Sequence, residues 1–242
     1  MPIAKTPGSE ELLTQLMKTP TDLSAIEDLI QQKHYTPEEI SRAGYDFAEK
    51  CFLEDNEYLD AHFEEYAQAE AKLIPGLRSA KMPSVFKILL KHGLDPNAFC
   101  EDETVIESVA SVPNGYVAAD TLALLLENGG DPLQTAGEET PFDAIEFKVI
   151  FDAIEMRNRM VYDAAVHCWF VLLGFTAGRE ETRDRVDVFS SRRSECDLPP
   201  FELTDLKEHR NYTFAITNVA GRGENWSLHI IDKRTFWEVA RL

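Results

Sequence analysis

The spacing of apolar residues changes along this chain of 242 residues. Over about the first 178 positions, apolar residues recur every three to four residues, which is typical of amphipathic helices. The helices that this spacing predicts cover residues 22–32, 36–52, 56–73, 85–90, 122–126 and a pair within 142–177. This part of the chain is therefore predicted to be mainly α-helical.

The last third of the chain has a different period. Apolar residues alternate with polar or small ones over 212–217 and again over 226–231, and a glycine-containing turn is expected between them. Further strands are expected at 236–242 and 201–206. We expect a small antiparallel sheet that either caps the helical part or forms a separate domain.

Two segments that lie 36 positions apart share the same pattern of leucine, glycine and Asp-Pro residues. Leu89–Ala98 reads LLKHGLDPNA, and Leu125–Gln134 reads LLENGGDPLQ. The register extends beyond them, because Thr104 matches Thr140. A shared period of this size indicates stacked supersecondary units.

Each piece of the repeat has a physical reason. Gly93 and Gly129 follow helical runs, where a residue with positive φ ends the helix at no steric cost to glycine. The Asp-Pro pair that follows turns the chain and prevents further helix. Thr104 and Thr140 are each followed three residues later by an acidic residue, which predicts a capping box at the start of the next helix.

These motifs resemble those of ankyrin repeats. Thr140–Ile145 (TPFDAI) is similar to the Thr-Pro-Leu-His-x-Ala motif, and Leu-Leu-x-x-Gly-x-Asp-Pro is similar to the end of the second ankyrin helix. The resemblance implies an ankyrin-like α-hairpin solenoid over residues 1–178, with the clearest repeats at about 82–117 and 118–153. A β-rich cap or small domain would follow at 179–242. Because the family period is about 33, we expect divergent repeats.

The charge of the chain restricts its partners. Asp and Glu number 43 against 24 Lys and Arg, a net charge of −19. Such a surface repels nucleic acid and anionic membranes and attracts basic proteins. Four scattered cysteines and the lack of a long apolar run predict a soluble cytoplasmic protein with reduced thiols.

No pattern of catalytic or metal-binding residues is present. The sequence contains no Gly-x-Ser-x-Gly, no Walker loop and no His-Glu-x-x-His, and its six histidines lack metal-ligand spacing. We therefore expect no enzymatic activity, no cofactor and no metal site.

The resemblance to ankyrin repeats places partner contacts on the loop tips, here Asn97–Glu103 and Leu133–Glu139. Both tips end in acidic residues, and the acidic helix at 56–73 adds more. The residues expected to bind a partner are Asn97, Phe99, Glu101, Asp102, Glu103, Gln134, Glu138, Glu139, Asp60 and Glu64. The leading hypothesis is a non-catalytic protein–protein interaction module that binds a basic protein, for example as an immunity or inhibitor protein.

An alternative hypothesis places the activity in the C-terminal sheet. The sheet would then act as a small-ligand or enzymatic domain, with the repeats as its scaffold. A pocket between Tyr212, Trp226 and Trp237 would support this alternative.

Overall fold

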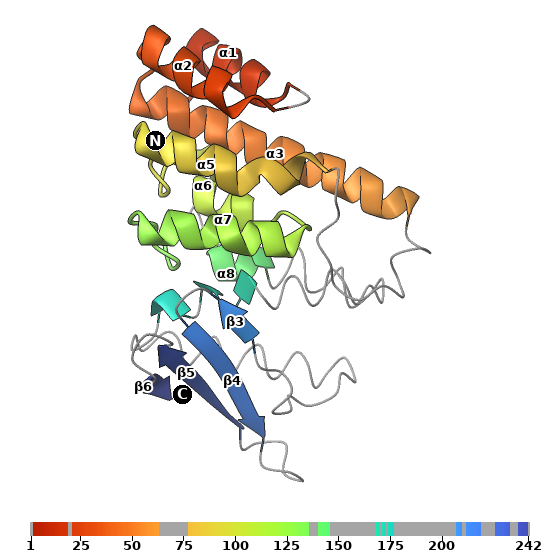
Figure 1. Ribbon diagram of the computed structural model, residues 1–242, viewed down its shortest axis with the longest axis vertical. Coiled ribbons are helices and arrows are strands. Elements are labelled where there is room, and N and C mark those ends of the chain that lie inside the picture. Colours follow the sequence, from red (N-terminus) through yellow and green to blue (C-terminus); the bar gives the residue numbers. More distant parts are fainter. Residues whose placement is uncertain are drawn as a thin grey trace. The chain divides into compact units, whose positions relative to one another are not determined.

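The computed structural model divides into two compact units, Met1–Cys168 and Trp169–Leu242. It is mainly α-helical in the part of the chain that it describes (Figure 1). The described residues are 2–18, 21–62, 77–135, 140–145, 168–169, 171–172, 174–176, 207–209, 212–218, 226–232 and 237–241.

Helices of the first unit contact one another in two rows. The elements are α1 (Pro7–Leu16), α2 (Leu23–Lys33), α3 (Pro37–Ala61), the 3-10 turn η1 (Arg78–Lys81), α5 (Met82–Lys91), β1 (Phe99–Cys100), β2 (Glu103–Thr104), α6 (Val105–Ala110), α7 (Gly115–Glu127) and α8 (Pro141–Asp143). One row of contacts runs from α1 through α3 and α6 to α8, and the other runs from α2 through α5 to α7. Figure 1 shows α3, α5 and α7 as successive layers. No helix among the described residues is long and apolar enough to span a membrane.

The helix starts follow from local sequence. The helices α1, α3, α6 and α8 begin with capping boxes, in which a threonine side chain and the residue three positions later bond to each other's backbone N–H. The threonines are Thr6, Thr36, Thr104 and Thr140. Each such cap stabilises its helix by about 1 kcal/mol. The boxes at Thr104 and Thr140 confirm the prediction, whereas α1 was not predicted.

The ends of α5 and α7 are the same turn built twice. Gly93 and Gly129 have φ angles of 103° and 93°. In each turn the glycine N–H bonds to the carbonyl three residues earlier (3.2 and 3.3 Å), and the next N–H bonds to the carbonyl five residues earlier (3.0 Å in both). The side chains of Asp95 and Asp131 then accept the N–H two residues later, at 2.9 and 3.1 Å. The predicted glycine stops and Asp-Pro turns are confirmed.

The helix α3 is longer than the sequence predicted. We expected one helix to end near Phe52 and an acidic helix to cover 56–73, but α3 runs without interruption to Ala61. Between Gly44 and Ala61 the sequence contains no proline or glycine, and Cys51, Asp55 and Leu59 extend one buried face at a spacing of four. The rest of the predicted acidic helix lies outside the described residues.

The second unit contains a sheet of four antiparallel strands. Its order is β3 (Lys207–His209), β4 (Tyr212–Asn218), β5 (Trp226–Asp232) and β6 (Trp237–Arg241). The alternating segments 212–217 and 226–231 lie in β4 and β5. The fourth strand is at 207–209, because these residues pair with 212–214, and the predicted strand at 201–206 lies outside the described residues.

Cys51, Cys100 and Cys168 are buried free thiols. Burial raises the pKa of all three thiols, to about 12 for Cys100. They therefore remain protonated and pack as small apolar side chains, in agreement with the prediction.

Candidate functional site

A β-hairpin follows the first Asp-Pro turn and carries several of the predicted contact residues. β1 pairs with β2 so that Phe99 faces Thr104 and Cys100 faces Glu103, which leaves Glu101 and Asp102 at the tip. Both tip residues are exposed. Glu101 has a φ of 55°, a left-handed conformation that costs a residue other than glycine about 1 kcal/mol. Backbone strain of this kind is often found at functional sites.

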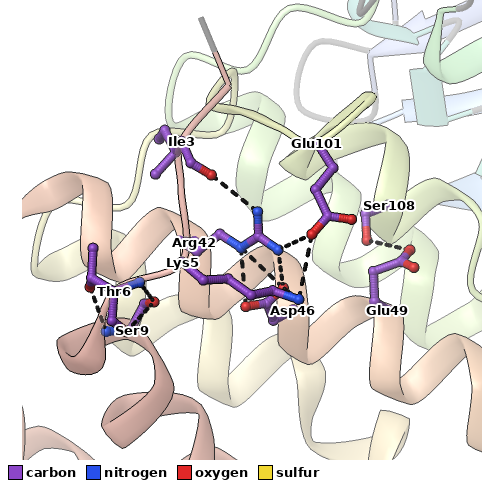
Figure 2. Close-up of polar contacts among 9 residues, drawn as sticks. All are labelled: Ile3, Lys5, Thr6, Ser9, Arg42, Asp46, Glu49, Glu101 and Ser108. Atoms are coloured by element: carbon purple, nitrogen blue, oxygen red, sulfur yellow. Dashed lines mark hydrogen bonds and ion pairs between the residues drawn. The ribbon is translucent and has the colours of Figure 1, made fainter.

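The guanidinium of Arg42 on α3 lies behind the hairpin tip, and the residue is only 2% exposed. Its Nε donates to both carboxylate oxygens of Asp46 at 3.1 Å, and its Nη2 donates to Asp46 Oδ1 at 2.8 Å. Nη2 also donates to Glu101, and Nη1 donates to the Ile3 carbonyl at 3.0 Å. Figure 2 shows the guanidinium surrounded by these acceptors. Arg42 therefore joins α3, the hairpin and the segment before α1. Its bonds to the two carboxylates are charge-assisted, and such bonds are about twice as strong as neutral ones.

Lys5 approaches the same carboxylates from the solvent side (Figure 2). Its Nζ lies 3.4 Å from Glu101 Oε1 and 3.7 Å from Asp46 Oδ1. Two residues earlier, the Ile3 N–H donates to the Phe99 carbonyl at 2.7 Å. The segment that contains Ile3 and Lys5 therefore lies against the edge of β1.

The charges of this cluster balance. Burial alone would lower the pKa of Arg42, but its hydrogen bonds to Asp46 and Glu101 outweigh burial and raise it. The bond from Arg42 holds the pKa of Glu101 below its ordinary value, and Lys5 adds to this effect. Two cations and two carboxylates meet here, so much of the Glu101 charge is neutralised within the molecule.

Two of the predicted contact residues, Asn97 and Gln134, connect the repeated turns to each other. Asn97 Nδ2 donates to the Gly129 carbonyl at 2.9 Å, and Asn97 Oδ1 accepts the Asp131 N–H at 2.8 Å. Gln134 Nε2 donates to the Asn97 carbonyl at 3.1 Å. The two turns are therefore neighbours in space, and these two side chains serve internal bonds.

The other predicted contact residues that the structure describes, Phe99, Glu103 and Asp60, do not lie together. Phe99 and Glu103 are partly buried on the hairpin strands. Asp60 is exposed in the last turn of α3, 14 positions after Asp46, which is about 21 Å along the helix axis. The structure therefore does not bring Asp60 to the hairpin tip. The remaining predictions, Glu64, Glu138 and Glu139, lie outside the described residues.

Sequence reasoning missed Lys5, Arg42 and Asp46, which hold the hairpin tip. One signal was available, because Arg42 and Asp46 are spaced four apart within a helix whose neighbouring positions are apolar. Opposite charges at this spacing on one helix face interact with each other. The partner Glu101, 59 residues later, has no such local signal.

A second buried carboxyl group lies farther along α3. Asp55 is 0% exposed, and neither of its oxygens accepts a well-formed hydrogen bond from a described residue. Burial raises its pKa to about 7; the nearby Ser79 hydroxyl and Asn114 backbone lower it in part, and Glu54 raises it. Asn114 Nδ2 in turn donates to Ser79 Oγ at 3.0 Å. Asp55 therefore titrates near neutral pH.

The register of the C-terminal sheet separates the three aromatic residues of the alternative hypothesis. Asp232 of β5 pairs with both Tyr212 and Trp237, so these two residues lie at the same end of the sheet. Trp226 pairs with Asn218 at the other end, about 20 Å away along β5. The strand register therefore does not supply the support that a pocket between all three aromatic residues would have given, and the alternative hypothesis stays untested.

Comparison with models of known protein families, with characterised proteins and with solved structures finds no match to this chain. The resemblance to ankyrin repeats therefore stays a prediction that depends on the motifs themselves.

Proposed function

We propose that this chain is a non-catalytic protein-binding module, built as an ankyrin-like stack of helix pairs, and that its partner is a basic protein. The two rows of helix contacts support this proposal, because in a stack each helix contacts the equivalent helix of the next pair. The net charge of −19 supports a basic partner.

The observation that carries the proposal is the pair of bonded turns. Gly93 and Gly129 stand in the same hydrogen-bond pattern, and Asn97 bonds to the second turn through both atoms of its amide. Loops that leave two adjacent, equivalent turns emerge on the same edge of the molecule. Repeat proteins use such an edge, with the concave surface beside it, to bind other proteins.

The contact surface is narrower than the sequence predicted. Glu101 is bonded to Arg42 and Lys5, so it holds the hairpin in shape more than it attracts a partner. Asp102, beside it at the exposed tip, keeps its charge available to solvent. We therefore assign the first electrostatic contact with a basic partner to Asp102.

Charge reversal at the tip tests this assignment. The variant Asp102→Lys should capture less of a basic protein from a lysate at low salt than the unchanged chain, and the association rate with the purified partner should fall several-fold, because reversal removes electrostatic attraction. The difference should shrink at high salt. Asp28→Lys, on the exposed face of α2, makes the same charge change away from the hairpin and serves as the control.

Two results would contradict the proposal: equal capture by the two variants, or captured proteins that are not basic. The same surface suits an immunity protein that blocks a basic toxin or nuclease. Identification of the captured protein by mass spectrometry distinguishes this role from others.

A further inference from the structure

The non-helical segment Pro2–Thr6, which we call the strap, contacts the hairpin as a bound peptide would. Ile3 makes one backbone hydrogen bond to Phe99 of β1 and accepts a second bond from Arg42, while Lys5 lies between two carboxylates. Main-chain bonds combined with one charged side chain in a matching site are the usual means of recognising a non-helical peptide.

The groups that receive the strap are fixed by other contacts. Arg42 and Asp46 have side chains only 2% and 6% exposed, and three hydrogen bonds within α3 join them. Arg42 also holds Glu101 in its left-handed conformation at the tip. The site therefore keeps its shape independently of the strap, as a pre-organised binding site does.

Thr6 at the end of the strap caps α1, but the part of the strap before it is held less firmly than the groups that receive it. Lys5 has 53% of its side chain exposed, and exposed ion pairs are weak and are screened by salt. Ala4, between the two contact residues, is exposed. Without Lys5 the site contains one cation and two carboxylates, so it has a net negative charge that a lysine compensates.

We propose that the strap is an internal occupant of a peptide-binding site, and that a partner binds by replacing it. The replacing segment would be non-helical and would carry an apolar residue followed two positions later by a lysine. This inference deepens the proposed function and rests on it for the identity of the partner. Whether the strap occupies this site can be tested without the partner, by using a peptide that has the sequence of the strap.

The test measures whether the site accepts the strap sequence from a separate molecule. A fluorescent peptide with the sequence of residues 2–7, PIAKTP, is titrated into the full chain and into the double variant Ile3→Pro/Lys5→Glu, followed by anisotropy. Proline removes the N–H that bonds to Phe99, and glutamate is repelled by Asp46 and Glu101. Because the tethered strap competes at a high effective concentration in the unchanged chain, the double variant should bind the peptide at least about tenfold more tightly.

Three controls separate this site from general electrostatic attraction. The peptide PIAETP should not bind, and Glu101→Gln added to the double variant should weaken the binding of PIAKTP. Lys18→Glu, which changes an exposed lysine outside the strap in the same way, should leave peptide binding as in the unchanged chain. Circular dichroism checks that the helices persist, and if they do not, the single variant Lys5→Glu replaces the double variant.

Two results would overturn the inference. One is equal affinity of the double variant and the unchanged chain for PIAKTP, and the other is equal affinity of the double variant for PIAKTP and PIAETP. If the peptide fails to bind while basic proteins are still captured through Asp102, only the strap inference fails. If the peptide binds but no basic protein is captured, only the proposed function fails.

Discussion

The helix α3 buries two carboxyl groups in opposite ways. Asp46 is 5% exposed and accepts three hydrogen bonds from Arg42, one turn earlier on the same helix. Asp55 is 0% exposed and accepts none of good geometry from the described residues. Burying a carboxylate is unfavourable by several kcal/mol unless a partner compensates, so the two groups have opposite effects on stability near neutral pH.

The difference shows that burial alone does not define the role of a charged residue. At Asp46, Arg42 compensates the carboxylate with hydrogen bonds and fixes the hairpin at the same time. At Asp55 the charge is disfavoured, so the proton is retained up to a pH of about 7. Of these two carboxyl groups, only Asp46 belongs to a charged cluster that can take part in binding. Asp55 instead makes the stability of the fold depend on pH.

The largest expected effect comes from Arg42→Met. This change leaves the buried Asp46 carboxylate without its hydrogen bonds from Arg42 and with only the exposed Lys5 as a nearby cation. Removal of one member of a buried pair costs about 3–5 kcal/mol. The free energy of unfolding, measured with urea, should fall by this amount. Lys87→Met, on the exposed face of α5, should change it by less than about 0.5 kcal/mol.

The double variant Arg42→Met/Asp46→Leu sharpens this result. Because it removes both charges, it should recover most of the stability lost in Arg42→Met. If Arg42→Met alone lowers the free energy of unfolding by less than about 1 kcal/mol, the buried Asp46 carboxylate does not need Arg42 to compensate it. Asp46 and Asp55 would then not differ in the way described above.

A smaller effect of opposite sign is expected for Asp55→Asn. The folded-state pKa is raised from the ordinary 3.8 to about 7, so the folded protein loses stability as the pH rises from about 4 to above 7. Removing the carboxylate should therefore stabilise the protein by about 1–3 kcal/mol at pH 8 and by very little at pH 4. Urea unfolding across this pH range measures the effect.

Asp28→Asn, at an exposed position of α2, is the matched control for Asp55→Asn. Its effect should be within about 0.5 kcal/mol at every pH. A destabilising Asp55→Asn at pH 8 would mean that the charged form of Asp55 is compensated in the folded protein.

The smallest effect is expected for Glu101→Gln. Glu101 has half of its side chain exposed, and such ion pairs contribute less than about 1 kcal/mol. Because its folded-state pKa is lowered, this contribution is present above the ordinary pKa of 4.5 and is lost as the pH falls through the folded-state value. The difference between Glu101→Gln and the unchanged chain should therefore vanish on acidification, whereas the effect of Asp55→Asn grows as the pH rises. A difference that stays constant throughout acidification would contradict this.

The predictable part of the fold consists of features that depend on a few consecutive residues. The caps at Thr104 and Thr140 each need a threonine and an acidic residue three positions later, and the turns at Gly93 and Gly129 close within six residues. The candidate site was predicted only in part, since the hairpin tip was recognised but its supports were not. Asn97, expected to face a partner, bonds instead to a turn more than 30 residues later.

The sequence by itself determined where α5 and α7 end and where α6 and α8 begin, that a turn is built twice at a distance of 36 positions, and that the chain has a large negative charge. Only the tertiary structure decided that Arg42 meets Glu101, that Lys5 lies against the same carboxylates, and that Asp55 is buried with no well-formed hydrogen bond from a described residue. The physical reason is the range of the interactions. Caps and turns are satisfied within one helical turn, whereas the free energy of a buried charge depends on neighbours that packing brings from distant parts of the chain.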